Sequence, residues 1–334
     1  MAPTTLFTAV SSSARQLLQL LRCIAFNNKA HVRISPDGLR ITTEESSIME
    51  AFVFLEKSLF TSYTYNQPLP PSSQDDPPDP PHFQISLNSL LETLNIFTLS
   101  DPNATKRPGD GGPGDAFAAH RLGRHAGINA FTSHALGTCT FSYDGEGDPL
   151  SIHMSESGVT TTCDLTTYDP ISSEEIPFSR ESIALKTIMR ASSLLEAISE
   201  LSSLNPSSLT IVASAMSSAN PTLSLSASGA LGSANVEFTT ATPSDTPVLE
   251  TYQCPRKTTA SFRFSLLKSA QRAMQAATKV SLRLDEEGVL NLQFLVEVDA
   301  PGGLGHTFVE FRVVPLVEGE AEMDGNGSDS SGEL

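Results

Sequence analysis

The chain has 334 residues, which is long enough for two domains that each bury a core. Its composition is ordinary for a globular protein, but its net charge of -17 argues against indiscriminate binding to nucleic acid, while it permits a local basic surface. No run of about 18 apolar residues is present to span a bilayer, and the N-terminus lacks the apolar core of a signal peptide. The four cysteines are too far apart in sequence for a zinc motif or a disulfide framework; they are Cys23, Cys139, Cys163 and Cys254. We therefore expect a soluble intracellular protein without a cofactor or a metal.

The first part of the chain predicts a short strand, a helix and a hairpin. Residues 6–10 alternate as a strand, and the serines at 11–13 supply a helix N-cap. Residues 14–26 have a helical period that separates an apolar face from a basic one. The apolar face carries Leu17, Leu20, Leu21 and Ile24, and the opposite face carries Arg15, Gln19 and Arg22. Residues 30–35 and 39–43 then form a hairpin, in which Val32 and Ile34 lie on one side and His31 and Arg33 on the other.

This combination of helix and hairpin returns three more times. The further helices are predicted at 86–97, 188–201 and 266–278, and their hairpins at 152–159, 209–228 and 280–289. Three of the four turns contain a glycine, at Gly38, Gly158 and Gly288, where a tight hairpin needs a positive φ. Helices combined with mainly antiparallel strands predict an α+β fold that is internally duplicated.

Composition predicts the domain boundaries. We expect a first domain at 1–167, a polar connector at 168–177, a second domain at 178–315 and a disordered acidic tail at 316–334. The first domain has two disordered insertions, at about 66–81 and at 98–128. The second insertion is locally basic, and a solvated linker is favoured there over a contact with phosphate. The tail carries six acids and no Lys or Arg, and the serines among them, Ser328, Ser330 and Ser331, are predicted phosphorylation sites.

The sequence shows no persuasive active site. Asp144, Glu146 and Asp148 have the Asp-x-Glu spacing of metal-dependent exonucleases, in which carboxylates hold two metal ions. Glycines separate these acids and Pro149 follows them, so a hairpin turn is the favoured interpretation. His120, His125 and His134 lack the spacing of metal ligands.

The helix faces are more informative. On the fourth helix Lys268, Arg272 and Gln275 share one face, Lys279 follows just beyond, and apolar side chains occupy the other face. Together with the first helix this gives two helices with basic outer faces, which suits tracking of a phosphate backbone without reading of bases. The other two helices do not follow this pattern. The second carries Asn88, Glu92 and Asn95, and the third carries Glu196 and Glu200, with Lys186 and Arg190 ahead of it.

Several spaced blocks resemble a known family. Residues 6–41 resemble the first domain of sliding clamps of the proliferating-cell-nuclear-antigen type. More narrowly, the chain is similar to the Rad-one subunits of the nine-one-one DNA-damage checkpoint clamp. The blocks that carry this resemblance are Ala51-Phe-Val-Phe54, Phe83-x-Ile-Ser-Leu87, Gly158-Val-x-Thr-x-Cys163, Phe264-Ser-Leu-Leu-Lys268, Lys279-Val-Ser-Leu-Arg283 and Phe308-Val-Glu-Phe311.

The resemblance implies a sliding-clamp fold of two similar domains, each with two helices on antiparallel sheets. It implies a nuclear protein that joins two other clamp subunits in a heterotrimeric ring around double-stranded DNA at damage sites. It also implies an ATP-driven clamp loader and recruited checkpoint and repair proteins as partners, and no membrane.

Under this resemblance the residues facing DNA are Arg15, Gln19, Arg22, Lys186, Arg190, Lys268, Arg272 and Lys279, and no residue is catalytic or binds a metal. Two alternatives stay open. One is a 3′→5′ exonuclease that uses the carboxylates at Asp144 and Glu146. The other is an interaction scaffold without a role on DNA.

Overall fold

A computed structural model describes residues 5–66, 80–98, 138–156, 159–170, 175–240 and 247–317. Most of the insertion predicted at 66–81 lies outside the described residues, as do residues 99–128, Gly158 of the second predicted turn, the three histidines that lack metal-ligand spacing, and Ser328, Ser330 and Ser331 of the tail. Within the described part of the chain, no helix is long and apolar enough to cross a membrane.

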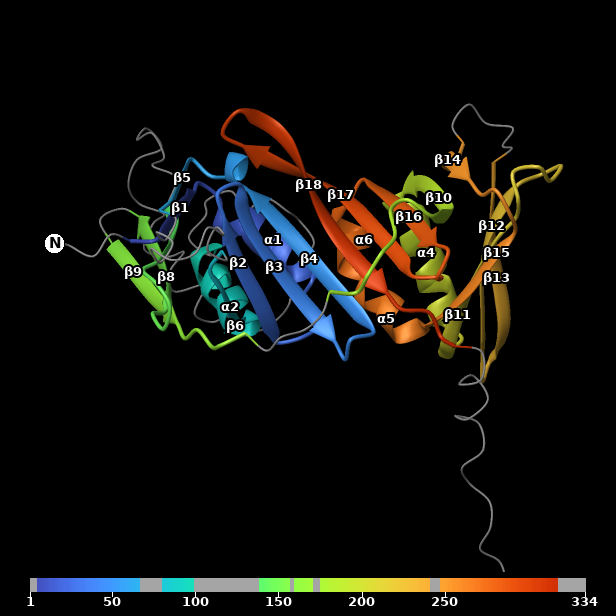
Figure 1. Ribbon diagram of the computed structural model, residues 1–334, viewed down its shortest axis with the longest axis horizontal. Helices are drawn as coiled ribbons and strands as arrows, with labels where there is room; N and C mark the ends of the chain where they lie inside the picture. Colours follow the sequence, from blue (N-terminus) through green and yellow to red (C-terminus); the bar gives the residue numbers. More distant parts are fainter. Residues whose placement is uncertain are drawn as a thin grey trace, which may run out of the picture. The chain divides into compact units, whose positions relative to one another are not determined.

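The chain divides into two compact units, which are drawn in Figure 1. Unit 1 comprises Met1–Thr43, Val53–Ser172 and Glu297–Thr307, and unit 2 comprises Glu44–Phe52, Ser173–Val296 and Phe308–Leu334. The chain passes from one unit to the other after residue 172, inside the connector predicted at 168–177. It also passes between the units within strands β3, β4, β17 and β18, which the sequence pattern did not indicate.

Unit 1 contains two helices and two groups of antiparallel strands. Its elements are β1 (Phe7–Ser11), α1 (Ala14–Cys23), β2 (Lys29–Ser35), β3 (Gly38–Glu45), β4 (Met49–Glu56), the 3-10 helix η1 (Lys57–Leu59), β5 (Ser62–Tyr65), β6 (His82–Ser86), α2 (Leu87–Thr98), β7 (Thr138–Tyr143), β8 (Leu150–Glu156) and β9 (Val159–Leu165). One group is the five-stranded sheet β5-β1-β7-β8-β9, and the other has the order β4-β3-β2-β6. The two helices pack against each other.

Unit 2 repeats this plan. Its elements are β10 (Ile183–Arg190), α4 (Ala191–Ser202), β11 (Pro206–Ala213), β12 (Thr222–Gly229), β13 (Gly232–Thr239), β14 (Leu249–Gln253), β15 (Thr258–Arg263), α5 (Phe264–Ser269), α6 (Gln271–Ala276), β16 (Lys279–Asp285), β17 (Leu290–Ala300) and β18 (Gly303–Val313). The strands form the four-stranded sheet β13-β12-β11-β15 and a second group with the order β14-β10-β16-β17. Because helices combine with antiparallel sheets in both units, the predicted α+β class is confirmed.

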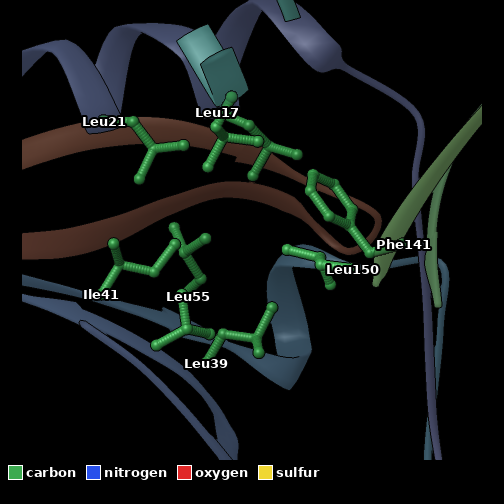
Figure 2. A pocket seen from close by; sticks show the side chains of 9 residues that line it. Leu17, Leu21, Leu39, Ile41, Leu55, Phe141 and Leu150 are labelled. Atoms are coloured by element: carbon green, nitrogen blue, oxygen red, sulfur yellow. The ribbon is translucent and has the colours of Figure 1, made fainter. Parts of the chain in front are cut away.

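The core of unit 1 lies where α1 meets both groups of strands, and it is closely packed. Figure 2 shows Leu17 and Leu21 of α1 directed toward Leu39, Ile41 and Leu55, with Phe141 and Leu150 at one end. These side chains, with Val32 and Leu90, surround a cavity of about 10 Å³. A cavity of that size has room for no more than about one water, and an apolar lining keeps it dry.

The first helix and two of the turns follow the prediction. Ser13 caps α1, because its side-chain oxygen accepts a hydrogen bond from the amide of Gln16 at 3.2 Å. Gly288 has a φ of +83°, as the predicted turn requires. Gly38 is needed for another reason as well, since a Cβ there would overlap the carbonyl oxygen of Leu55.

Two helix predictions were wrong in part. The third helix begins at Ala191 and not at 188, because residues 188–190 pair with β16 as the end of β10. Their burial alternates with the period of a strand. The fourth helix is not continuous. Ala270 donates its amide to the carbonyl of Leu267 at 3.2 Å, a tight i to i-3 turn that separates α5 from α6.

Candidate nucleic-acid interface

Helix α1 presents the basic face that its period predicts. Its buried side chains include Leu17, Leu18, Leu20 and Leu21. Gln19 and Arg22 are exposed, and Arg15 is half-buried. Arg22 donates from Nη2 to Oδ1 of Asn95 on α2 at 3.3 Å, so its guanidinium is oriented along the surface of the helix pair.

The pair of short helices α5 and α6 presents a second basic face, in unit 2. Leu266, Leu267, Ala273 and Met274 are buried. Lys268, Arg272 and Gln275 are exposed. Lys268 before the break at Ala270 and Arg272 after it are both exposed. The tight turn at Ala270 therefore does not change which side of the helix pair is buried.

Three of the predicted residues lie on strands and not on helices. Lys186 and Arg190 belong to β10, and Lys279 is the first residue of β16. Burial alternates along both strands, so these side chains lie on the face opposite the buried Leu185, Met189 and Val280. Lys279 also forms an ion pair with Glu250, with Nζ 2.6 Å from Oε2. The structure therefore places five of the eight predicted residues on helices, in two sets, and places the other three on faces of strands.

The remaining helices have the neutral and acidic surfaces that the sequence indicates. On α2 the exposed polar residues are Asn88, Glu92 and Asn95. On α4 the charged residues are Glu196 and Glu200, and both are exposed. A helix surface of this kind repels phosphate or leaves it unbound, so contacts with a phosphate backbone would come from α1 and from α5 with α6.

The acids considered for nuclease chemistry lie in a solvent-exposed turn between β7 and β8. Asp144, Glu146 and Asp148 are all exposed. The turn is closed by a hydrogen bond from the amide of Asp148 to the carbonyl of Gly145 at 3.1 Å, and Gly147 has a φ of +87°. Among the residues that the structure describes, no three acidic, His or Cys side chains are grouped so that they would hold a metal ion. The turn therefore has the form that the hairpin interpretation predicted.

Shifted pKa values occur in buried groups and not on the helix faces. Burial raises the pKa of the Cys139 thiol to about 12. Burial, and to a lesser extent the charge of Cys254, raises the pKa of Tyr252 to about 12. Burial is also the main cause of the raised pKa of Tyr63, whose hydroxyl donates to the carbonyl of Ser35 at 2.6 Å. These pKa shifts come mainly from burial, and none of the three groups lies on α1, α5 or α6.

Sequence reasoning missed two charged clusters. One is a buried network around Arg312 in unit 2, and the other is a row of basic side chains across strands β3, β2 and β6 in unit 1. The alternation at 30–35 placed His31 and Arg33 on one side of a strand, which is the only local signal for the row. The network around Arg312 had no local signal in the sequence, because alternation along β18 does not reveal that Glu310 is buried.

Comparison with known proteins adds the family. The model of the family described as "Repair protein Rad1/Rec1/Rad17" matches residues 6–296. The DNA damage checkpoint control protein rad1 of Schizosaccharomyces pombe is 30% identical over 312 residues, which cover 93% of this chain and 87% of that protein. The cell cycle checkpoint protein RAD1 of Homo sapiens is 26% identical over 303 residues, covering 91% of this chain and 89% of its own length. A more distant relative, the DNA repair exonuclease REC1 of Mycosarcoma maydis, is 22% identical and covers 86% of this chain and 87% of its own length.

Solved structures give the fold. The Proliferating Cellular Nuclear Antigen of Entamoeba histolytica superposes with a TM-score of 0.64 at 15% identity, covering 94% of this chain and 100% of that chain. PCNA of Thermococcus kodakaraensis superposes with a TM-score of 0.61 at 16% identity, covering 93% and 100%. The chain, with helices on antiparallel sheets in both units, therefore has a sliding-clamp fold. The chain belongs to the Rad1/Rec1/Rad17 family of repair proteins.

Proposed function

We propose that this chain is one subunit of a multi-subunit checkpoint clamp that encircles double-stranded DNA in the nucleus and holds checkpoint and repair proteins there. One observation carries the proposal. In an acidic protein with the sliding-clamp fold, exposed cations stand on α1 of one unit and on α5 and α6 of the other, above helix faces that are otherwise buried. Membership of a family whose relatives are named checkpoint and repair proteins supports it.

The chemistry of these faces suits enclosure of DNA better than recognition of a sequence. Arg15, Arg22, Lys268 and Arg272 project from helices as separate cations, and such groups bind phosphate without distinguishing bases. The overall charge of -17 opposes tight binding elsewhere on the surface. Weak, salt-dependent contacts of this kind let a closed ring hold duplex DNA and still slide along it.

Two sheet edges support assembly into a ring. Strand β9 ends the five-stranded sheet of unit 1, and β13 ends the four-stranded sheet of unit 2. Each has one hydrogen-bonded neighbour among the described strands, β8 and β12 respectively. A strand edge of this kind presents free N–H and C=O groups that pair readily with the edge of another chain. We infer that β9 and β13 are where the other clamp subunits bind.

The test is retention on DNA of the ring assembled with two clamp subunits of the same organism. Charge reversal at Arg15, Arg22, Lys268 and Arg272 should leave assembly intact and make the loaded ring dissociate at lower salt. Neutralising several phosphate contacts changes affinity by orders of magnitude between about 50 mM and about 200 mM salt. The matched control reverses Lys57 and Arg256, two exposed cations in ion pairs away from these helices.

Unchanged retention of the variant would argue against the proposed contacts. A ring that assembles and never retains duplex DNA, even unmodified, would instead favour the plain interaction scaffold. Lys186, Arg190 and Lys279 are best tested as a separate triple variant, because they lie on strand faces. The clamp loader and the recruited proteins belong to the same proposal, and pull-down with the assembled ring would identify them.

An exonuclease is the second candidate, since one distant relative is named an exonuclease. Asp144 and Glu146 are the residues to test, although they are exposed in a turn. We expect highly purified protein with Mg²⁺ to leave labelled DNA intact, and the variant carrying Asp144→Ala and Glu146→Ala to be indistinguishable from it. Degradation that disappears in this variant and remains in an Asp164→Ala control would establish the enzyme instead.

A further inference from the structure

Strand β2 of unit 1 lies in the middle of a row of basic side chains, which are one lysine, two arginines and two histidines. In the antiparallel register Arg33 stands directly opposite Arg40 of β3 and, on the other side, opposite His82 of β6. His31 and Lys29 follow at alternate positions along β2 and so share the face of Arg33. Arg33, His82 and Lys29 are exposed, and Arg40 and His31 are half-buried.

This basic strand face, defined by Lys29, His31, Arg33, Arg40 and His82, lies on the side of the strands away from α1. The intervening residues Val32 and Ile34 are buried, and Val32 lines the core cavity together with Leu17 of the helix. Because successive side chains of a strand point to opposite faces, these basic side chains point away from that core. Like charges that stand directly opposite each other weaken strand pairing, so this arrangement costs stability in the protein alone.

Within the described part of unit 1, the cation at the centre of the row, Arg33, is not neutralised by an acid. No carboxylate there lies within ion-pair distance of Arg33. Asp37 pairs with Lys57 at the hairpin turn, with 3.4 Å between Oδ1 and Nζ.

Glu44, two positions beyond Thr42 on the same side of β3, is an acid on this face, and it accepts hydrogen bonds from the amide and hydroxyl of Ser47 at 2.9 and 3.1 Å. Gln84 lies opposite His31, and its amide Nε2, which can only donate, is 2.9 Å from Nε2 of the imidazole, so that ring nitrogen is the acceptor.

An aromatic side chain extends the same face at its far edge. Tyr168 forms an isolated antiparallel bridge with Gln84, in which each amide donates to the other residue's carbonyl at 2.9 Å. Residues opposite each other in such a bridge point to the same face. The side chain of Tyr168 is 56% exposed, which is unusual for a large aromatic group. The face therefore combines a positive row with an exposed aromatic ring beside it.

We propose that the basic strand face binds an extended acidic segment of a partner protein, with carboxylate or phosphorylated side chains at alternate positions. The spacing supports this occupant. Alternate residues of an extended chain are about 7 Å apart, which matches the spacing of Lys29, His31 and Arg33 along β2. Charge-assisted hydrogen bonds from the exposed Arg33 and Lys29 to the acids would offset the repulsion between Arg33 and Arg40. Tyr168 offers an aromatic contact to an intervening apolar residue.

The choice of a peptide over DNA rests on the proposed function. If α1 faces duplex DNA in the ring, the basic strand face is on the opposite side of its sheet and contacts a different ligand. The basic row is also short, because it crosses only β3, β2 and β6 of a longer sheet, and the chain as a whole is acidic, so a flexible segment suits it better than a long polyanion.

The experiment uses the full chain and a labelled peptide of eight residues that alternates Glu and Thr, followed by fluorescence anisotropy. We expect saturable binding at about 50 mM salt that weakens as salt rises, as charge pairing requires. Arg33→Glu should weaken binding at least tenfold, and Lys57→Glu, an exposed cation of the same unit, should change it less than twofold. Arg33→Thr should raise the thermal midpoint of the protein while it lowers peptide affinity, since it removes the repulsion with Arg40.

Other results would overturn the inference. No saturable peptide binding, or equal loss with Lys57→Glu, would do so. Tighter binding of a single-stranded oligonucleotide of equal charge would identify a nucleic-acid face instead. Binding that appears only in a chain truncated after Val317 would assign the face to the acidic tail of this protein. Retention of the assembled ring on duplex DNA should not change with Arg33→Glu, so failure here and failure of the proposed DNA contacts are separable.

Discussion

Nη1 of Arg312 lies 2.9 Å from Oε1 of Glu50, in a pair whose side chains are only 12% and 5% exposed. The same guanidinium donates to the carbonyl of Ile176 at 2.9 Å, and the amide of Ile176 donates to Glu50 Oε2 at 3.3 Å. Glu310, which accepts from Asn291 at 2.8 Å, lies 3.3 Å from Nε of the arginine. One buried cation thus fixes the end of the connector to the strands of unit 2.

Replacing Arg312 should be among the most destabilising single changes in the protein. Arg312→Met leaves Glu50 and Glu310 buried without their cation, and removing one partner of a buried pair costs about 3–5 kcal/mol of unfolding free energy. Denaturant unfolding measures this. The control is Arg256→Met, which breaks an exposed pair with Glu286 and should cost about 0–1 kcal/mol. Equal losses of unfolding free energy in the two variants would show that the buried network contributes no more stability than an exposed ion pair.

Tyr252 predicts loss of stability at alkaline pH. Burial raises its pKa to about 12, above the value of about 10 in an unfolded chain. The folded state therefore holds this proton more tightly, so its contribution is complete below about pH 10 and is lost as pH rises toward about 12. Denaturant unfolding of wild type between these pH values should show a falling unfolding free energy, and Tyr252→Phe should show a shallower fall.

At about pH 8 the same Tyr252→Phe substitution should cost about 0.5–1.5 kcal/mol, because the hydroxyl donates to the carbonyl of Ser214 at 2.6 Å. A slope with pH that is identical in the two proteins would mean that Tyr252 is not responsible. Tyr168→Phe is the control, since that side chain is exposed.

Leu21 tests the core of unit 1. It is buried and lines the small cavity shown in Figure 2, so Leu21→Ala enlarges a void that is already apolar. Substitutions of this kind cost about 2–5 kcal/mol. Gln19→Ala, on the exposed side of the same helix, should stay within about 0.5 kcal/mol of wild type by thermal or chemical unfolding. A small effect at Leu21 would mean that the packing around α1 is looser than the structure indicates.

Cysteine modification tests the inferred subunit edge at β9. Cys163 is half-buried on this strand, and the other three cysteines are buried. Burial raises the pKa of Cys139 to about 12, so little of its reactive thiolate exists at about pH 8. Iodoacetamide should therefore modify Cys163 first, as peptide mass spectrometry would show. Assembly with clamp partners should slow that reaction, and an unchanged rate in the ring would place the interface elsewhere.

Local pattern alone determined much of this protein. The helical period at 14–26 is enough to separate Leu17 and Leu21 from Arg22, because the positions that share a face of a helix depend only on nearby residues. The alternation at 30–35 likewise separates Val32 from Arg33. The glycine at 288 indicates its turn, and repetition of helix and hairpin indicates the duplicated α+β architecture. The resemblance of the spaced blocks indicated the family.

Tertiary structure decided what depends on partners distant in sequence. Residues 188–190 have a sequence compatible with a helix, and pairing with β16 makes them a strand, which moves Arg190 onto a sheet face. The opposition of Arg33 and Arg40 follows from strand register, and the burial of Glu310 follows from the presence of Arg312 and Asn291. Register and burial are set by long-range packing, in which a one-residue shift moves every side chain to the other face. No local period in the sequence contains that information.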